Sequence, residues 1–291
     1  MLETVTPKQV ARAIGVSESS LKRWCDRGLL STVRTAGGHR RIPISSVVTF
    51  LRSTQHPVVK PELIGLPATC GKTEWVVARA KSQLAAALVE GDEGRCQQIV
   101  TDMWLAGQPI PVICDEVIAA AFRDIGELWS CKKADVYQER RACSIMLNIL
   151  HELKMGTPPG SPECVATGGT VTGDQYQLPT SMVELVLQSS GWAARSLGTS
   201  VPFESMARAI RDVRPKIFWL SVSFIEDPAQ FLDGFATLNA AADQVGSIIA
   251  LGGFALTTAI KQKIRYSVAC DSMQQLAEFA TKFRCSAASS G

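Results

Sequence analysis

The first sixty residues concentrate the side chains that could bind a phosphate backbone. They contain ten Lys or Arg residues and three Asp or Glu residues, whereas residues 61–291 contain twenty and twenty-four. The formal net charge of +3 therefore combines a basic N-terminal region with a mildly acidic remainder. This asymmetry is typical of nucleic-acid binding. The alternative is a small helical domain with a solvated basic face.

Two short helices would present these side chains to a duplex. We predict one helix over residues 7–13, opened by Pro7, and a second over residues 18–26, capped by Ser17 after a glycine turn. Such a pair is a helix-turn-helix, whose second helix enters the major groove. From this helix we expect DNA contacts by Ser17, Ser19, Ser20, Lys22 and Arg23.

A β-hairpin, or wing, should follow. Residues 32–35 and 39–44 bracket Ala-Gly-Gly, which favours a hairpin turn, and a further helix is predicted over 46–54. Arginines supply phosphate contacts, and glycines let the backbone approach the sugar-phosphate chain. The expected DNA contacts of the wing are Arg34, Thr35, Gly38, His39, Arg40 and Arg41. The order of these parts and the phrase RTAGGHRRI resemble the winged helix-turn-helix of the MerR family, which implies double-stranded operator DNA as a partner.

Composition limits the class of protein. The chain has 291 residues, of which 46% are hydrophobic and 20% charged, so it is long enough for two or three globular domains. It lacks a signal-peptide pattern and any run of about 18 apolar residues, so we expect a cytoplasmic protein with no membrane partner. Nine cysteines without a C-x-x-C pair or a nearby histidine predict buried, reduced thiols and no metal site.

The middle of the chain has helical periodicity. Residues 57–73 are rich in Pro and Gly and predict a linker between a DNA-binding domain at 1–56 and a second domain at 74–155. Short connections between helices favour an antiparallel four-helix bundle. Asp135 and Gln138 form a plausible capping pair for the last of these helices. The helices are predicted over 74–90, 92–106, 112–129 and 134–154.

Beyond a second linker at 156–162, short apolar runs alternate with amphipathic helices. This alternation predicts a flavodoxin/Rossmann-like domain at 163–285 with a five-stranded parallel sheet, so the fold class is multidomain α and α/β. Ligands of such sheets bind at the carboxyl ends of the strands, here the loops 169–177, 223–227 and 252–253. Strands are predicted over 164–168, 194–198, 216–222, 247–251 and 266–269. Helices are predicted over 178–190, 203–213, 228–243, 254–264 and 271–283.

A MerR-type head, a four-helix bundle and a Rossmann-like domain in this order resemble the CarH, CarA and LitR group of cobalamin-linked transcriptional repressors, over essentially the whole chain. In that group the bundle carries Trp, nine residues, then Glu-His. Here Trp129 is followed after nine residues by Glu139 and Arg140. The group's second motif is Asp-x-His-x-x-Gly, whose histidine coordinates cobalt. Here Asp174 is followed by Gln175 and Tyr176, so the aspartate matches and the histidine does not.

The resemblance implies a pocket with altered chemistry. Arginine cannot lose its proton to bind cobalt, and tyrosine, with a pKa near 10, is a poor ligand at neutral pH. The domain could bind no cobalamin, or bind it with its own base attached, or bind another ligand through Tyr176 and Arg140. A core role for Trp129, an ion pair for Glu139 and a turn role for Asp174 are the alternatives. The candidate cofactor-binding residues are Trp129, Glu139, Arg140, Asp174, Tyr176, Ser221, Ser223, Gly252 and Gly253.

The expected function is a sequence-specific DNA-binding transcriptional regulator, a repressor, that is a homo-oligomer and needs no cofactor. Its C-terminal region would control oligomerisation or respond to a small-molecule effector or an antirepressor protein. One alternative is an adenosylcobalamin-dependent, light-responsive repressor with non-standard ligation. Another is a corrinoid carrier or methyltransferase component. No nucleophile–base pair, phosphate loop or carboxylate dyad is evident, so we assign no catalytic residue and expect no enzyme activity.

Overall fold

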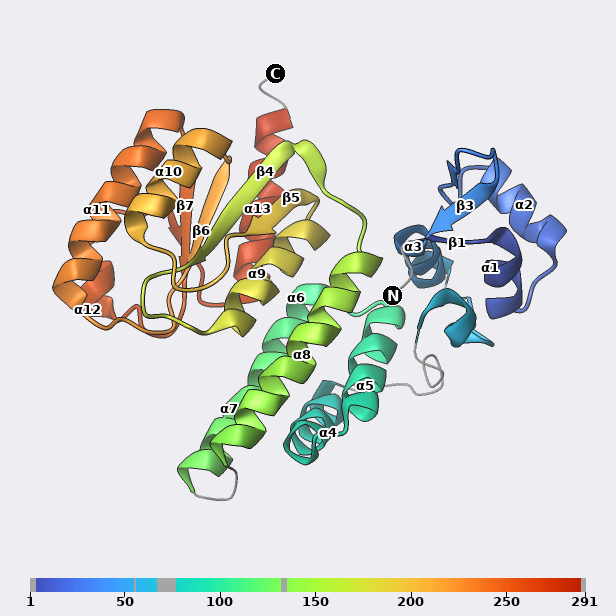
Figure 1. Cartoon of the computed structure of the whole chain (residues 1–291), viewed down its shortest axis with the longest axis horizontal. Helices are drawn as coiled ribbons and strands as arrows, with labels where there is room; N and C mark the ends of the chain where they lie inside the picture. Colours follow the sequence, from blue (N-terminus) through green and yellow to red (C-terminus); the bar gives the residue numbers. More distant parts are fainter. Residues whose placement is uncertain (1–3, 55, 67–76, 132–134, 289–291) are drawn as a thin grey trace. The chain divides into compact units, whose positions relative to one another are not determined.

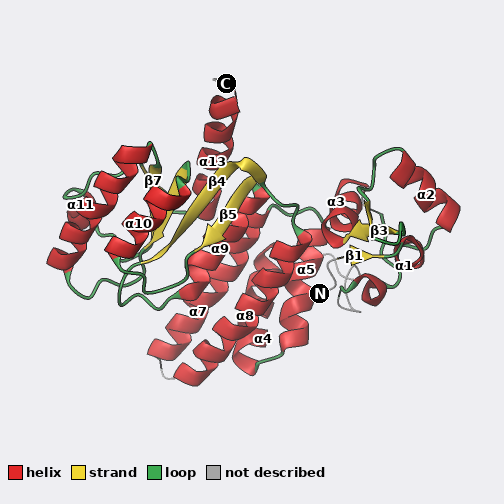
Figure 2. Ribbon diagram, turned by 45° about the horizontal axis from the view of Figure 1, so that its top comes forward, coloured by secondary structure: helices red, strands yellow, loops and turns green. Residues whose placement is uncertain are grey.

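The computed structural model describes residues 4–54, 56–66, 77–131 and 135–288. Its contacts divide the chain into two compact units, one ending at Pro158 and one starting at Pro159. The first unit consists mainly of helices with one small sheet, and the second is a sheet covered by helices (Figures 1 and 2). The predicted multidomain α and α/β class is confirmed.

The N-terminal part of the first unit is a winged helix-turn-helix. A capping box opens its first helix, because the hydroxyl of Thr6 accepts from the backbone N–H of Gln9 and the Gln9 side chain accepts from the N–H of Thr6. Strand β1 pairs with β3, and β3 pairs with β2. The elements are β1 (Thr4–Val5), α1 (Pro7–Ala13), α2 (Glu18–Asp26), β2 (Val33–Arg34), β3 (Arg40–Pro43) and α3 (Ile44–Thr54).

Part of the predicted linker packs against this domain. The helix η1 (Pro61–Ile64) contacts α1, and the side chain of Ile64 is fully buried. The backbone N–H groups of Val59 and Lys60 both donate to the carbonyl of Ala13. This segment is therefore attached to α1, because burial of its apolar side chains and two backbone hydrogen bonds hold it there. Residues 67–73 of the predicted linker lie outside the described residues.

The rest of the first unit is a bundle of antiparallel helices. The capping box predicted from Asp135 and Gln138 is present at the start of its last helix. The third helix begins at Ile110, two residues before the predicted start, and contains a π-helical turn, η2. The elements are α4 (Val77–Glu90), α5 (Glu93–Leu105), α6 (Ile110–Val112), η2 (Ile113–Ile118), α7 (Ala119–Ser130) and α8 (Val136–Gly156). Residues 74–76 lie outside the described residues.

The second unit contains the five-stranded parallel sheet that the sequence predicts, in the order β5-β4-β6-β7-β8. All four pairings between neighbouring strands are parallel. The strands are β4 (Ser161–Thr170), β5 (Trp192–Ser196), β6 (Ile217–Ser221), β7 (Ile248–Gly252) and β8 (Val268–Ala269). The helices are α9 (Gln177–Ser189), α10 (Phe203–Val213), α11 (Pro228–Val245), α12 (Thr258–Lys261) and α13 (Met273–Ala288).

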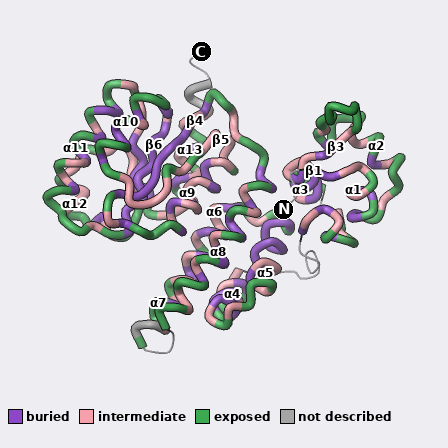
Figure 3. Tube along the Cα trace, in the orientation of Figure 1, coloured by how far each residue is buried: buried purple, intermediate pink, exposed green. Residues whose placement is uncertain are grey.

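Successive side chains of β6 point to opposite faces of the sheet. Phe218 and Leu220 enter the apolar core formed with α10 and α11. Trp219 points to the other face, where its indole N–H donates to the hydroxyl of Thr180 on α9 at 3.0 Å. Trp192 of β5 donates to the carbonyl of Ala280 on α13. Helices thus cover both faces, and the central strands are buried between them (Figures 1 and 3).

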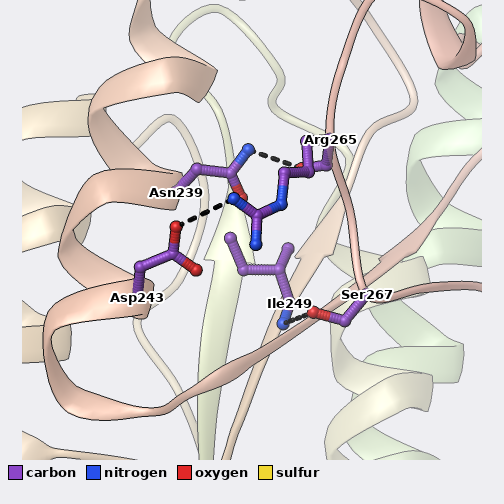
Figure 4. A network of polar contacts seen from close by, with 5 residues as sticks. All are labelled: Asn239, Asp243, Ile249, Arg265 and Ser267. Atoms are coloured by element: carbon purple, nitrogen blue, oxygen red, sulfur yellow. Dashed lines mark hydrogen bonds and ion pairs between the residues drawn. The ribbon is translucent and has the colours of Figure 1, made fainter.

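The segment before β8 is attached to α11 by polar contacts (Figure 4). The side-chain amide of Asn239 donates to the carbonyl of Arg265, and the guanidinium of Arg265 lies 3.3 Å from the carboxylate of Asp243. The predicted helix over 254–264 is shorter than expected. Gly253 has a φ of 125°, and α12 begins only after Thr257, which caps it.

The structure describes the side chains of seven of the nine cysteines, and none of these seven is in a disulfide. Cys70 and the side chain of Cys285 lie outside what it describes. Cys96, Cys114, Cys164 and Cys270 are buried. Cys25 and Cys143 are half-buried, and Cys131, which follows α7, is exposed. The expectation of uniformly buried thiols is therefore wrong at Cys131, because it lies on the connection between two helices.

Candidate functional sites

The second helix of the helix-turn-helix, α2, presents a polar surface. The hydroxyl of Ser17 accepts from the backbone N–H of Ser20 at 3.1 Å, which satisfies a free amide at the helix start. Leu21 is fully buried and fixes the rotation of the helix about its axis. Opposite this buried face, the long cationic side chains of Lys22 and Arg23 are exposed. Of the other predicted contacts on α2, Ser17 and Ser19 are exposed and Ser20 is half-buried.

The wing is a short hairpin with a tight turn. The backbone N–H of Gly38 donates to the carbonyl of Thr35 at 2.8 Å, and the N–H of Thr35 donates to the carbonyl of His39 at 3.0 Å. Gly38 has a φ of 79°, which L side chains rarely adopt, so glycine is required for this turn. The predicted contacts Arg34, Thr35, Gly38 and His39 are exposed, and Arg41 is half-buried.

Arg40 differs from its neighbours because it already has an anionic partner. Its guanidinium lies 2.9 Å from the carboxylate of Asp26, the last residue of α2. The two side chains are 30% and 49% exposed, so solvent screens this pair and its contribution is small. A DNA phosphate would have to compete with Asp26 for Arg40. The wing and α2 are thereby connected through a contact that sequence spacing did not indicate.

The winged helix-turn-helix also contacts the bundle within the first unit. Helix α3 lies against α5 and α8. The guanidinium of Arg52 on α3 lies 5.8 Å from the ring centroid of Trp104 and donates to the carbonyl of Gln108. Trp104 in turn fills the space beside Gly156, the last residue of α8. These contacts give a direct path between the basic head and the bundle.

Trp129, Glu139 and Arg140, the positions that match the bundle motif of the CarH, CarA and LitR group, lie at one end of the helix pair α7 and α8. Trp129 is in the last turn of α7, and its side chain is outside what the structure describes. Glu139 and Arg140 follow in the first turns of α8, where Glu139 is half-buried and Arg140 is exposed. The backbone therefore brings the three positions to the same end of the bundle.

Asp174 has a structural role in the second unit. Its side chain is fully buried and accepts three backbone hydrogen bonds. One carboxylate oxygen accepts from Ser223 at 2.6 Å and from Phe224 at 3.3 Å, and the other accepts from Tyr176 at 3.0 Å. The carboxylate thus connects the loop after β4 to the loop after β6. The turn role considered from the sequence is present, and it extends across the sheet edge.

Two residues that sequence reasoning did not identify complete this connection. The hydroxyl of Thr170 donates to the carbonyl of Asp174 at 2.6 Å, and the hydroxyl of Ser200 accepts from the N–H of Gly173 at 3.1 Å. Ser200 adopts a φ of 55°, in the left-handed region. No sequence signal pointed to these residues, because Thr and Ser are ordinary in loops and their partners are distant in the chain.

The small residues of the candidate pocket lie in closely packed surroundings. Ser221 ends β6 and is buried, and the amide of Ser223 is occupied by Asp174. A Cβ atom on Gly253 would lie 2.1 Å from the carbonyl oxygen of Val222, and one on Gly252 would lie 3.1 Å from that of Cys270. These glycines allow backbone segments to approach each other, so their presence does not by itself indicate a ligand.

The residues at this edge do not fit a cobalamin whose cobalt is bound by histidine. All three histidines, His39, His56 and His151, precede residue 159. Tyr176 occupies the position of the histidine in the Asp-x-His-x-x-Gly motif of the CarH, CarA and LitR group, and its side chain is 46% exposed. Within the described ranges, no group of three His, Cys, Asp or Glu side chains could hold a metal ion. None of the helices searched in those ranges is long and apolar enough to cross a membrane.

Two family models match the chain. A helix-turn-helix domain model matches residues 4–55, and a B12 binding domain model matches residues 80–154. Among curated proteins, the HTH-type transcriptional repressor CarH of Myxococcus xanthus is 25% identical over 254 residues, which cover 79% of this chain and 83% of that protein. Dimethylamine corrinoid protein 1 of Methanosarcina acetivorans is 28% identical over 112 residues, 38% of this chain and about half (53%) of that protein.

A solved structure shares the fold of most of the chain. The monomethylamine corrinoid protein of Methanosarcina barkeri aligns with a TM-score of 0.57 at 15% identity, covering 72% of this chain and 100% of that chain. The corrinoid protein, at 15% identity, is similar to this chain in fold alone. The chain therefore joins a helix-turn-helix domain to a B12-binding-type domain and is similar to the repressor CarH over most of its length.

Proposed function

We propose that this protein is a transcriptional repressor that binds its operator DNA through α2 and the wing. We propose also that its bundle and sheet control how several DNA-binding domains in one oligomer act together. The observation that carries this proposal is the exposed set of donors on α2 and the wing, within a region of ten basic and three acidic residues. Basic side chains displace counterions from phosphates, whereas base edges in the major groove supply sequence information.

Assembly would set operator occupancy. When two DNA-binding domains belong to one oligomer, binding of the first to its half-site raises the effective concentration of the second at the neighbouring half-site. The oligomer therefore binds the operator more tightly than a single domain does. Any effector or partner protein that changes the oligomeric state would therefore change repression steeply. The contact of Arg52 with Trp104 supports this proposal, because it gives the bundle a mechanical connection to the DNA-binding domain.

The DNA-binding assignment is tested by salt dependence. After operator fragments are selected from genomic DNA, fluorescence anisotropy gives the affinity of the full chain as a function of salt. We expect Arg41→Ala to weaken binding and to reduce the slope of log K against log salt by about 0.9, the value for one phosphate contact. Arg208→Ala on α10 is the matched control, because Arg208 is equally cationic, exposed and remote from the wing in sequence. An unchanged slope for Arg41→Ala would contradict the wing assignment.

The direction of regulation needs a separate measurement. A reporter gene placed downstream of the selected operator should be silenced when the chain is expressed and restored by Lys22→Ala combined with Arg23→Ala. A reporter that is activated by the chain would overturn the repressor assignment while leaving DNA binding intact.

We propose further that regulation proceeds without histidine-ligated cobalamin. The absence of histidine after His151 and the internal use of Asp174 support this. Absorbance spectra and size-exclusion chromatography, with and without adenosylcobalamin, in the dark and after illumination, provide the test. We expect no co-migrating chromophore and no light-dependent change of size.

A cobalamin-dependent repressor is the second candidate. It is favoured by the match of a B12 binding domain model to residues 80–154 and by the similarity to CarH. A chromophore that co-migrates with the protein would support it. We do not propose an enzymatic corrinoid carrier, because the helix-turn-helix would have no role in one.

A further inference from the structure

A cavity of about 480 Å³ opens at the carboxyl edge of the sheet, between the loops after β4 and β6 and the helices α10 and α11. Its volume lies in the range of small-molecule sites. Of the candidate residues implied by the family resemblance, none whose side chain the structure describes lines it. It is therefore a different site from the degenerate cofactor position.

The cavity lies at the switch point of the sheet. Strands β4 and β6 are neighbours, yet the helix that follows β4 packs on one face and the helices that flank β6 pack on the other. Adjacent loops that diverge to opposite faces leave a crevice between them, and open α/β sheets bind their ligands in such crevices. Asp174 holds these two loops together and so maintains the wall of the cavity.

Aromatic rings form part of the cavity lining. Phe203 begins α10 and Phe231 lies in the first turns of α11, and their rings meet edge to face with centroids 5.7 Å apart. Both side chains are more than nine-tenths buried. The Phe203 ring lies over Gly234, where a Cβ atom would come within 2.2 Å of it. Val171 and Ile225 add to the apolar surface.

The remaining lining is strongly acidic. Glu204, Glu226, Asp227 and Asp233 line the cavity, and none of the described lining residues is Lys, Arg or His. Asp227 caps α11 by accepting from two backbone N–H groups. Among the residues that the structure describes, the other three carboxylates have neither an ion-pair partner nor a hydrogen-bond partner. A crevice lined by charges of one sign concentrates their field, so it attracts cations and repels phosphates and carboxylates.

We propose that this cavity binds an organic cation, namely an ammonium group carried on an apolar body. The apolar body would lie against the apolar wall to which Phe203, Val171 and Ile225 contribute, and the ammonium would lie beside the exposed carboxylates of Glu226 and Asp233. The cation relieves the mutual repulsion of these carboxylates, which gives the site its charge preference. The site does not depend on DNA binding or on cobalamin.

Isothermal titration calorimetry of the full chain with benzyltrimethylammonium tests the proposal. We expect saturable binding with one site per chain. Glu226→Gln combined with Asp233→Asn should weaken it by about tenfold, because two screened charge interactions are lost. Asp212→Asn is the matched control on α10, since Asp212 is exposed and does not line the cavity. Circular dichroism of each variant establishes that it remains folded.

Three further compounds distinguish the chemistry. Benzyl alcohol, which lacks the charge, and benzoate, which reverses it, should not bind. Spermidine, which has charge but no apolar body, should bind more weakly than benzyltrimethylammonium. The proposal is overturned if benzyltrimethylammonium does not saturate the protein, or if the double variant binds it as tightly as the control variant does. It is also overturned if spermidine or benzoate binds as tightly as benzyltrimethylammonium.

Discussion

Replacing Asp174 by alanine should destabilise the second unit strongly. The carboxylate is fully buried and accepts from Ser223 at 2.6 Å, Tyr176 at 3.0 Å and Phe224 at 3.3 Å. A hydrogen bond to a charged group contributes about 1.5–3 kcal/mol, and a buried donor left without a partner adds a desolvation cost. The third bond is long and the Tyr176 side chain is half-exposed, so we expect a loss of about 3–5 kcal/mol in the free energy of unfolding.

Asp227→Ala is the matched control. Asp227 lies at the same edge of the sheet and also accepts backbone hydrogen bonds, from Ala229 and Gln230, but it is exposed. Water can replace an exposed cap, so this change should cost only about 1 kcal/mol. The contrast between the two variants isolates the effect of burial.

The chain has two units and six tryptophans distributed over both, so fluorescence would mix their transitions. Hydrogen exchange by mass spectrometry at increasing urea, followed in peptides from β4 and β6, reports the second unit alone. A loss below about 1.5 kcal/mol for Asp174→Ala, or equal losses for the two variants, would refute the conclusion that this carboxylate holds the sheet edge together. The same variant should also lose cation binding, because the cavity wall includes both connected loops.

Two more predictions concern the first unit. Gly156→Ala should lower the free energy of unfolding of the first unit by about 1–3 kcal/mol, because the new Cβ would lie 2.4 Å from the Trp104 ring. Gly126→Ala, on an open face of α7, should instead raise it by about 0.5–1 kcal/mol. Equal midpoints of thermal unfolding for the two variants would contradict both expectations. Iodoacetamide at about pH 8 should modify the exposed Cys131 well before Cys96, since burial raises the pKa of Cys96 to about 12 and the thiolate is the reactive form. Peptide mass spectrometry over time measures both rates, and equal rates would show that the bundle opens readily.

The sequence alone predicted correctly those features that depend on residues close together in the chain. Ser17 and the pair Asp135 and Gln138 cap their helices as predicted, because a cap involves residues only three positions apart. The parallel sheet followed from the alternation of apolar runs with helices, since that alternation leaves few topologies. The positions of α1, α2 and the wing followed from glycine, proline and cap signals in the same way.

Only the tertiary structure decided which distant residues meet. Asp174 looked like a remnant of a cofactor motif, and the fold shows its carboxylate bound to the amide of Ser223, 49 residues away. Arg40 looked like a phosphate ligand, and the fold pairs it with Asp26. The acidic cavity combines segments that follow different strands. Residue types and periodicity indicate which faces are buried, but contacts across the chain depend on the packing of the whole domain, which local pattern does not encode.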